Sequence, residues 1–158
     1  MNYSESVTKK LIKKNLTISF MESCTSGLLA SMFTDTEGAS KVFTGSLVTY
    51  SNEQKIKAGV DAKIISDYGV YSSECASEMA RVVQSIYGTN ISVGITGTTG
   101  NVDPNNPDSI QGEAFFCIRV NEKSYGFHIQ KNVSGLSRKE IKQSYADTVY
   151  AELLKILK

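Results

Sequence analysis

One junction limits the folds open to this chain more than any other stretch of its sequence. Residues 16–20 alternate apolar and polar side chains, which predicts a strand. Leu28, Leu29, Met32 and Phe33 then recur at helical spacing. Residues 21–27 therefore have to turn tightly from a strand into a helix, as chains do in α/β folds.

Ser23 lies in this turn, and we expect the turn to expose it near the helix N-terminus. Unpaired N–H groups and the positive end of the helix dipole favour an oxyanion or a phosphate there. Ser23 would then be a nucleophile or part of an anion clamp. Alternatively, Ser23, Thr25 and Ser26 only cap the helix through their side-chain oxygens. The turn alone leaves both interpretations open.

The rest of the chain alternates between helical and strand patterns up to residue 96, and a hairpin and a last helix follow. A first helix capped by Ser4 has an apolar stripe of Val7, Leu11 and Ile12, and a later one has Met79, Val83 and Ile86. The other expected strands lie at 43–50, 90–96, 113–120 and 125–130. A short helix that starts with residues 53–57, after the cap candidates Ser51 and Asn52, should stop at Gly59, and a second one, capped by Asp61, should end near Gly69. A longer helix opened by Ser72 or Ser73 should run through Tyr87, and a capping box at Ser137 should open the last helix.

This order predicts an α/β fold, a three-layer α/β/α sandwich with a mixed, mostly parallel sheet, and a single domain over residues 1–158. In open α/β sheets, ligands collect outside the carboxyl ends of the strands. We therefore expect three segments to meet there: the Ser23 turn, residues 50–55 and the glycine-containing loop that starts at residue 96.

Composition narrows the possible functions. A net charge of +1 offers no footprint for nucleic acid or a membrane surface. The three cysteines, outside any C-x-x-C, suggest reduced thiols, and Cys75 and Cys117 are expected to be buried. The reduced thiols and the lack of a signal-peptide or membrane-span pattern predict a cytoplasmic protein. We expect no metal and no cofactor, because neither ligand clusters nor nucleotide-loop motifs are present.

The residue inventory leaves few nucleophilic mechanisms. The sole histidine, His128, lies inside an expected strand, where a structural role is favoured over a Ser-His-Asp triad. A Ser-Lys pair remains, with Lys55 as the base at the second strand-to-helix junction. Its pKa would have to fall from about 10.4 toward neutrality, which corresponds to about 4 kcal/mol between protonation states. Spacing alone does not select Lys55 from the other lysines.

Several motifs resemble the CinA C-terminal domain family, in the same order along nearly the whole chain. They are Glu22-Ser23-Cys24-Thr25-Ser26-Gly27-Leu28, Val48-Thr49-Tyr50-Ser51-Asn52-Glu53-Gln54-Lys55, Gly59-Val60, Gly69-Val70-Tyr71-Ser72, Thr96-Gly97 with Gly100, Gly112, and Ser137-Arg138-Lys139-Glu140-Ile141-Lys142. The family includes amidohydrolases that convert nicotinamide mononucleotide to nicotinic acid mononucleotide and ammonia. The resemblance implies that function, in the stand-alone form without the N-terminal domain of some members.

The resemblance also implies roles for individual residues. Ser23 would be the nucleophile, Lys55 its base, and Tyr50 would assist proton transfer or orientation. Arg138 and Lys142 would meet the phosphate, and backbone N–H groups after Ser23 would form the oxyanion site. Further residues are expected to bind substrate: Glu22, Cys24, Thr25, Ser26, Gly27, Thr96, Gly97 and Gly100, with Thr25 and Thr96 near the reacting carboxamide.

The chain departs from the family pattern at several positions. Ser26 stands where the family usually has the first glycine of a pair, and Lys142 stands in place of an arginine. Residues 96–101, TGTTGN, replace a typical T-G-I-A-G-P, and residues 109–113 stand where K-P-V-G-T is usual. These departures bear on the substrate and on efficiency more than on the fold or the nucleophile.

Three functions follow from the sequence and the resemblance. The first is an amidohydrolase whose small-molecule partner is a pyridine nucleotide. The second is a catalytically silent nucleotide-binding or regulatory domain of the same family, and the third is an amidase for another small carboxamide. The resemblance also implies a homodimer or a larger homo-oligomer, which the apolar stripes alone cannot distinguish from a monomer.

Overall fold

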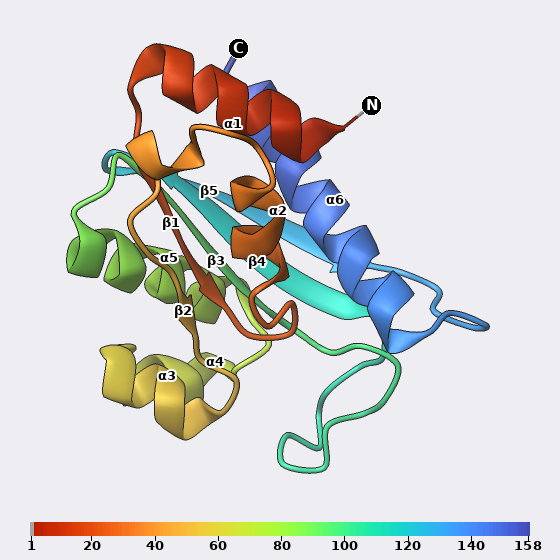
Figure 1. Cartoon of the computed structure of the whole chain (residues 1–158). Coiled ribbons are helices and arrows are strands. Elements are labelled where there is room, and N and C mark those ends of the chain that lie inside the picture. The colour runs from red at the N-terminus through yellow and green to blue at the C-terminus, as the bar shows by residue number, and fades with distance from the viewer. Residues whose placement is uncertain (1) are drawn as a thin grey trace.

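A five-stranded mixed sheet with the strand order β2-β1-β3-β4-β5 forms the middle layer of this computed structural model (Figure 1). The structure describes residues 2–158, so Met1 of the expected range 1–158 lies outside it. The strands are β1 (Ile18–Glu22), β2 (Leu47–Val48), β3 (Ile91–Gly97), β4 (Glu113–Val120) and β5 (Lys123–Gln130). β1 pairs in parallel with β2 and β3, whereas β4 is antiparallel to both of its neighbours. All strands except β4 therefore share one direction.

Helices cover both faces of this sheet. One face carries α1 (Tyr3–Lys14), α2 (Leu28–Thr34) and α6 (Arg138–Ile156), and the other carries α5 (Ser73–Tyr87) with α4 (Ala62–Tyr68) packed against it (Figure 1). α3 (Asn52–Ala58) follows the carboxyl end of β2, and a short 3-10 helix, η1 (Ala39–Lys41), precedes β2. The three-layer α/β/α fold expected from the sequence is confirmed.

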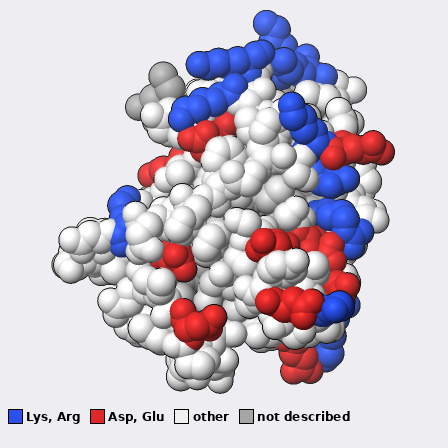
Figure 2. Space-filling view, turned by 180° about the vertical axis from the view of Figure 1, so that it is seen from behind, with Lys and Arg blue, Asp and Glu red and all other residues white. Residues whose placement is uncertain are grey.

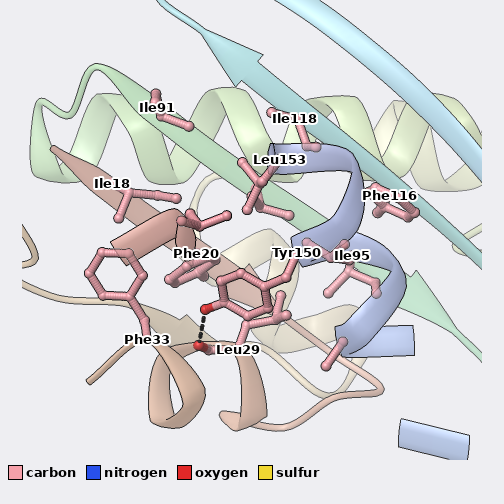
Figure 3. Close-up of a cluster of buried hydrophobic side chains, with 14 of the residues drawn as sticks. Ile18, Phe20, Leu29, Phe33, Ile91, Ile95, Phe116, Ile118, Tyr150 and Leu153 are labelled. Atoms are coloured by element: carbon pink, nitrogen blue, oxygen red, sulfur yellow. Dashed lines mark hydrogen bonds between the residues drawn. The ribbon is translucent and has the colours of Figure 1, made fainter. Parts of the chain in front are cut away.

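The main core lies between the sheet and the helices of the first face. Phe20 of β1 and Phe33 of α2 meet with their rings 6.0 Å apart, and Leu153 of α6 packs beside them (Figure 3). The buried phenol of Tyr150 donates a hydrogen bond of 2.5 Å to the Leu29 carbonyl, which ties α6 to α2. Because helices cover both faces, every residue of the central strand β3 is buried.

The helix boundaries follow the predicted caps. Ser51, Asp61, Ser72 and Ser137 are the N-caps of α3, α4, α5 and α6, and Ser137 with Glu140 forms the capping box. The first helix is capped by Asn2 and not by Ser4, because the Asn2 side chain accepts from the Glu5 N–H. Its lysines lie on its solvent side, and Lys and Arg gather at that end of the molecule in Figure 2.

Three expectations about individual elements are wrong in detail. The strand at 43–50 is reduced to β2, because side chains take up two backbone carbonyls just before it: the Tyr87 hydroxyl donates to the Ser46 carbonyl, and the Ser46 hydroxyl donates to the Phe20 carbonyl of β1. Ile86 is 50% exposed, and Val82 is buried in its place under the segment around Val60. The hairpin turn is shorter than 121–124, since β5 already begins at Lys123.

The cysteines Cys24, Cys75 and Cys117 are all buried and free. Over residues 2–158, none of the helices combines the length and the apolar character that crossing a bilayer requires.

A substitution at Gly94 tests how closely α5 packs on the sheet. A Cβ on Gly94 would lie 2.4 Å from the Ala76 carbonyl oxygen and 2.6 Å from the Ala80 nitrogen. These are backbone atoms of a helix and cannot rotate away, so Gly94→Ala should lower the free energy of unfolding by about 1–3 kcal/mol or more. Gly126→Ala, on β5 with no atom within 4 Å, is the control and should be neutral or slightly stabilising in urea denaturation. Equal effects of the two substitutions would contradict the close packing of α5 on β3.

Candidate active site

Ser23 and Lys55 meet at the carboxyl ends of two neighbouring parallel strands. Ser23 directly follows β1, and Lys55 lies in the first turns of α3, just after β2. The Lys55 Nζ lies 3.0 Å from the Ser23 Oγ, within hydrogen-bond distance. Both residues are almost fully buried, with exposed fractions of 1% for Lys55 and 5% for Ser23. We expected Ser23 to be exposed, but it is buried, although it does line a cavity.

Local structure explains how Lys55 reaches Ser23. The Ser51 hydroxyl accepts from the Gln54 N–H, so that α3 begins at Asn52 and Lys55 falls in its first turns. Side chains of an α-helix point back toward its N-terminus, and in α3 this direction leads to the end of β2. There the Lys55 Nζ also donates to the carbonyls of Thr49, at 2.9 Å, and Tyr50, at 3.3 Å.

The surroundings of Lys55 favour a neutral amine. Burial lowers the pKa of Lys55 from its ordinary value of 10.5, because the charged form loses its hydration. Within residues 2–158, no carboxylate lies within ion-pair distance of its Nζ to hold the proton. A buried lysine of this kind can accept a proton from a neighbouring hydroxyl.

Glu22, which we expected to bind substrate, occupies a structural position with its carboxylate buried. Its buried carboxylate accepts hydrogen bonds from the backbone N–H of Leu29, at 2.8 Å, and of Ala30, at 3.1 Å. The Thr25 hydroxyl donates to the same carboxylate at 2.7 Å. These N–H groups belong to the first turn of α2, which has no other side-chain cap. Glu22 therefore provides the cap that we considered for Ser23, Thr25 and Ser26.

The turn after Ser23 depends on two residues with left-handed backbones. Ser26 has a φ of 46° and Gly27 a φ of 99°. Side chains disfavour this region, which explains why the family pattern has glycine at the position of Ser26. Here the Ser26 hydroxyl accepts a hydrogen bond of 2.7 Å from the Lys142 Nζ, which links the turn to α6.

Two neighbouring cavities open at this edge of the sheet, and Ser23 and Lys55 line the first of them. The first, of about 490 Å³, is lined by residues from five segments: Ser23, Cys24, Tyr50, Ser51, Asn52, Glu53, Lys55, Val70, Tyr71, Gly97, Thr98, Thr99, Asn101, Val102, Asp103, Pro104, Asn105, Asn106 and Arg138. The second, of about 480 Å³, is lined by Cys24, Thr25, Ser26, Gly27, Leu28, Ser31, Tyr50, Arg138, Lys139, Lys142 and Gln143. Cys24, Tyr50 and Arg138 line both cavities.

Glu22 and two other expected ligands, Thr96 and Gly100, line neither cavity. Thr96 is fully buried, and its hydroxyl donates to the Val70 carbonyl at 3.1 Å. The Gly100 carbonyl accepts from the Gln111 side chain at 2.9 Å. Both residues therefore hold the loop after β3 in place, whereas Gly97 does line the first cavity.

Tyr50, which we expected to assist proton transfer or orientation, contacts the Ser-Lys pair through its main chain. Its backbone carbonyl accepts from Lys55 and, at 3.4 Å, from the Ser23 Oγ. Its side chain is 61% exposed at the rim of both cavities, where the phenol accepts a hydrogen bond of 3.3 Å from Arg138. The main chain of Tyr50 thus contacts the Ser-Lys pair, and its ring borders the entrance.

The other candidate nucleophiles and bases are less suited to catalysis than Ser23 and Lys55. Burial raises the pKa of Cys24 to about 12 and that of Cys75 to about 11, so both thiols stay protonated at neutral pH. His128 lies outside both cavities, pairs with Glu113 at 2.9 Å and stacks on Phe115. The structural role expected for His128 is confirmed.

The loop between β3 and β4 supplies a group that the sequence did not single out. The Asp103 carboxylate lines the first cavity and accepts a hydrogen bond of 2.6 Å from the Tyr71 hydroxyl. Asn106 donates to it at 2.7 Å, and the Asn105 N–H at 2.9 Å. Aspartate followed by asparagines in a loop is a known signal for such side-chain turns. The partner Tyr71 comes from another segment, which no local pattern reveals.

Glu22→Gln tests the capping role. An amide cannot accept from Leu29, Ala30 and Thr25 together, so the variant leaves buried donors unpaired and should lose about 1–3 kcal/mol of unfolding free energy. Chemical denaturation measures this loss. Glu37→Gln, an exposed change of the same kind, should leave stability unchanged. A Glu22→Gln protein as stable as the wild type would show that this carboxylate does not hold the turn.

The chain is similar to known proteins along most of its length. The family model of the CinA C-terminal domain matches residues 1–157. The chain is similar to the Protein MG115 homolog of Mycoplasma pneumoniae, 33% identical over 98% of this chain and 97% of that protein. It is also similar to a CinA-like protein of Fervidobacterium nodosum, 47% identical over 60% of this chain. That match spans 23% of the Fervidobacterium protein, and the matches to other CinA-like relatives likewise span about a quarter of their length.

Solved structures show the same fold. A CinA superfamily protein of Escherichia coli has a TM-score of 0.89 at 24% identity, with 98% of this chain and 88% of that chain covered. The competence/damage inducible protein CihA of Agrobacterium tumefaciens has a TM-score of 0.84 at 25% identity, covering 99% and 96% of the two chains. By its sequence match over residues 1–157, the chain belongs to the CinA C-terminal domain family.

Proposed function

We propose that this chain is an amidohydrolase that deamidates nicotinamide mononucleotide to nicotinic acid mononucleotide and ammonia. The observation that carries the proposal is the hydrogen bond of 3.0 Å between the buried Lys55 Nζ and the Ser23 Oγ at the edge of a cavity. A serine beside a buried amine that is held by neutral acceptors is suited to attack on a carbonyl carbon. The substrate is the one that the family resemblance implies.

The first half of the reaction forms an ester. Neutral Lys55 accepts the proton of Ser23 while the Ser23 Oγ bonds to the carboxamide carbon. The resulting Lys55 ammonium then gives this proton to the amide nitrogen, the C–N bond breaks, and ammonia leaves. In the second half, water loses a proton to Lys55 and attacks the ester carbon. Ser23 recovers its proton as the C–O bond to the enzyme breaks, and the acid is released.

Backbone N–H groups after Ser23 would stabilise the oxyanion of both tetrahedral intermediates. Within residues 2–158, the N–H groups of Cys24 and Thr25 donate to no backbone carbonyl, whereas the next N–H, of Ser26, bonds to the Ser23 carbonyl. Backbone donors directly beside the nucleophile are the type of group that supports developing negative charge. This supports the role that the resemblance implies for them.

Arg138 and Lys142 would bind the phosphate of the substrate. Arg138 lines both cavities and Lys142 the second one, each on the first turns of α6. An arginine can hold phosphate oxygens with two parallel hydrogen bonds, whereas a lysine acts as a point charge. The cationic side chains lie beside the cavity of Ser23, as an elongated nucleotide requires.

Activity of single variants tests the proposed function. The wild type should release ammonia and nicotinic acid mononucleotide from nicotinamide mononucleotide. Ser23→Ala and Lys55→Met should each lower kcat/KM by about a thousandfold or more, because nucleophile and base act as one unit. Lys57→Met, on the same helix but exposed, is the matched control and should keep full activity. Both products would be followed by an ammonia assay and chromatography.

Other outcomes separate the remaining functions. Saturable nucleotide binding without turnover would favour a silent binding domain, and ammonia release from other carboxamides alone would favour a different amidase. Full activity of Lys55→Met would remove Lys55 from the mechanism.

The pH dependence of activity follows from the direction in which the pKa of Lys55 is shifted. Because burial lowers this pKa, the amine is already neutral at a pH below the ordinary lysine value of 10.5. As the pH falls through the pKa of Lys55 in the folded protein, the amine becomes protonated and the base is lost. The profile of kcat/KM should therefore have an acidic limb below pH 10.5, with activity rising as pH rises through it. Activity that keeps rising up to pH 10.5 and levels off only there would contradict the lowered pKa.

A further inference from the structure

Asp103 holds a fixed negative charge inside the cavity of Ser23 and Lys55. The side chain lines this cavity from the loop between β3 and β4. Its Oδ2 accepts from the Tyr71 hydroxyl, at 2.6 Å, and from the Asn106 amide, at 2.7 Å. Its Oδ1 accepts from the Asn105 N–H at 2.9 Å. Three donors from two segments thus fix the position of one carboxylate.

All three donors are neutral, so the charge of Asp103 has no cationic partner. Within residues 2–158, no Lys, Arg or His side chain lies within ion-pair distance of this carboxylate. The hydrogen bond from Tyr71 lowers the pKa of Asp103, which keeps it ionised at neutral pH. Its Oδ1 has one protein donor, and a carboxylate oxygen can accept more than one. The cavity wall therefore offers an uncompensated anion to a ligand.

We propose that Asp103 is a specificity-determining residue that selects carboxamides attached to a positively charged ring over those on a neutral ring. The inference rests on the proposed function, in which the carboxamide carbon is attacked by Ser23. In an N-substituted pyridinium carboxamide the ring is bonded directly to that carbon, so its positive charge enters the same cavity. Arg138 also lines this cavity. Glu53 lines the cavity too, but its carboxylate pairs with Lys57 at 3.5 Å. The unpaired carboxylate of Asp103 and the guanidinium of Arg138 in one cavity suit a ligand that carries a cationic ring and a phosphate.

Binding to an inactive enzyme gives the cleanest test. The charge of Asp103 also acts on Lys55 and raises its pKa, so that a rate would mix recognition with catalysis. The probes are nicotinamide mononucleotide and its reduced form, which keeps the carboxamide, ribose and phosphate but has a neutral ring. Calorimetric titration of the full-length Ser23→Ala protein with each probe measures the preference for the charged ring.

We expect Ser23→Ala to bind the oxidised nucleotide about tenfold more tightly than the reduced one, a moderate value for one ionic contact in a solvated cavity. Ser23→Ala/Asp103→Asn should bind both with similar affinity, since asparagine keeps an acceptor but loses the charge. Ser23→Ala/Asp108→Asn is the matched control, because Asp108 is exposed on the same loop and lines neither cavity. It should keep the full preference.

Ser23→Ala/Tyr71→Phe removes one donor to Asp103 without changing the charge, and it should reduce the preference only in part. A preference that persists in Ser23→Ala/Asp103→Asn overturns the proposal. So does an equal loss of affinity for both nucleotides, which would assign Asp103 to the ribose or to the loop. Failure of Ser23→Ala to bind either nucleotide overturns it as well. The proposed function fails separately, when the wild-type protein releases no ammonia from nicotinamide mononucleotide.

Discussion

The contact between the Lys55 amine and the Ser23 hydroxyl is the constraint around which this end of the molecule is built. It requires the parallel pairing of β1 and β2, in which Glu22 lies opposite Val48 and the Thr49 N–H bonds to the Glu22 carbonyl at 2.8 Å. That pairing brings the residue after β1 and the first turns of α3 to the same edge of the sheet. Two backbone carbonyls, of Thr49 and Tyr50, then satisfy the buried amine.

The choice of carbonyls over a carboxylate as partners has a chemical consequence. A carboxylate beside Lys55 would stabilise its protonated form and raise its pKa, whereas burial among neutral acceptors lowers it. The carboxylates of Glu22 and Asp103 lie near this edge, and neither is within ion-pair distance of the amine. Glu22 is occupied by the N–H groups of α2, and Asp103 by Tyr71 and the asparagines of its own loop. Glu22 therefore caps α2, whereas Asp103 is held in the wall of the cavity.

Much of this arrangement could be predicted from the sequence. Short caps such as Ser51, Asp61 and Ser72 act over three residues, so they set the helix boundaries regardless of the tertiary structure. The convergence of Ser23 with residues 50–55 followed from the rule for carboxyl ends of parallel strands. The choice of Lys55 among the lysines needed the family resemblance, because periodicity does not distinguish it.

Features that depend on contacts between distant segments could not be predicted from the sequence. The strand around β2 is short because Tyr87, forty-one residues after Ser46, bonds to its backbone. Glu22 could not be told from a ligand, since its partners are N–H groups of a helix that begins six residues later. The role of the Tyr50 carbonyl and the pairing of Tyr71 with Asp103 likewise involve atoms that no residue pattern identifies.

The central claim is that Ser23 forms a covalent ester with the substrate, and mass spectrometry tests it most directly. The wild-type protein would be quenched with acid during turnover of nicotinamide mononucleotide, and its intact mass and peptides measured. The account predicts an added mass equal to the nucleotide minus ammonia, on the peptide that contains Ser23, and no such adduct in Ser23→Ala. Ammonia release by a protein that carries no adduct, together with activity retained in Ser23→Ala, would contradict it.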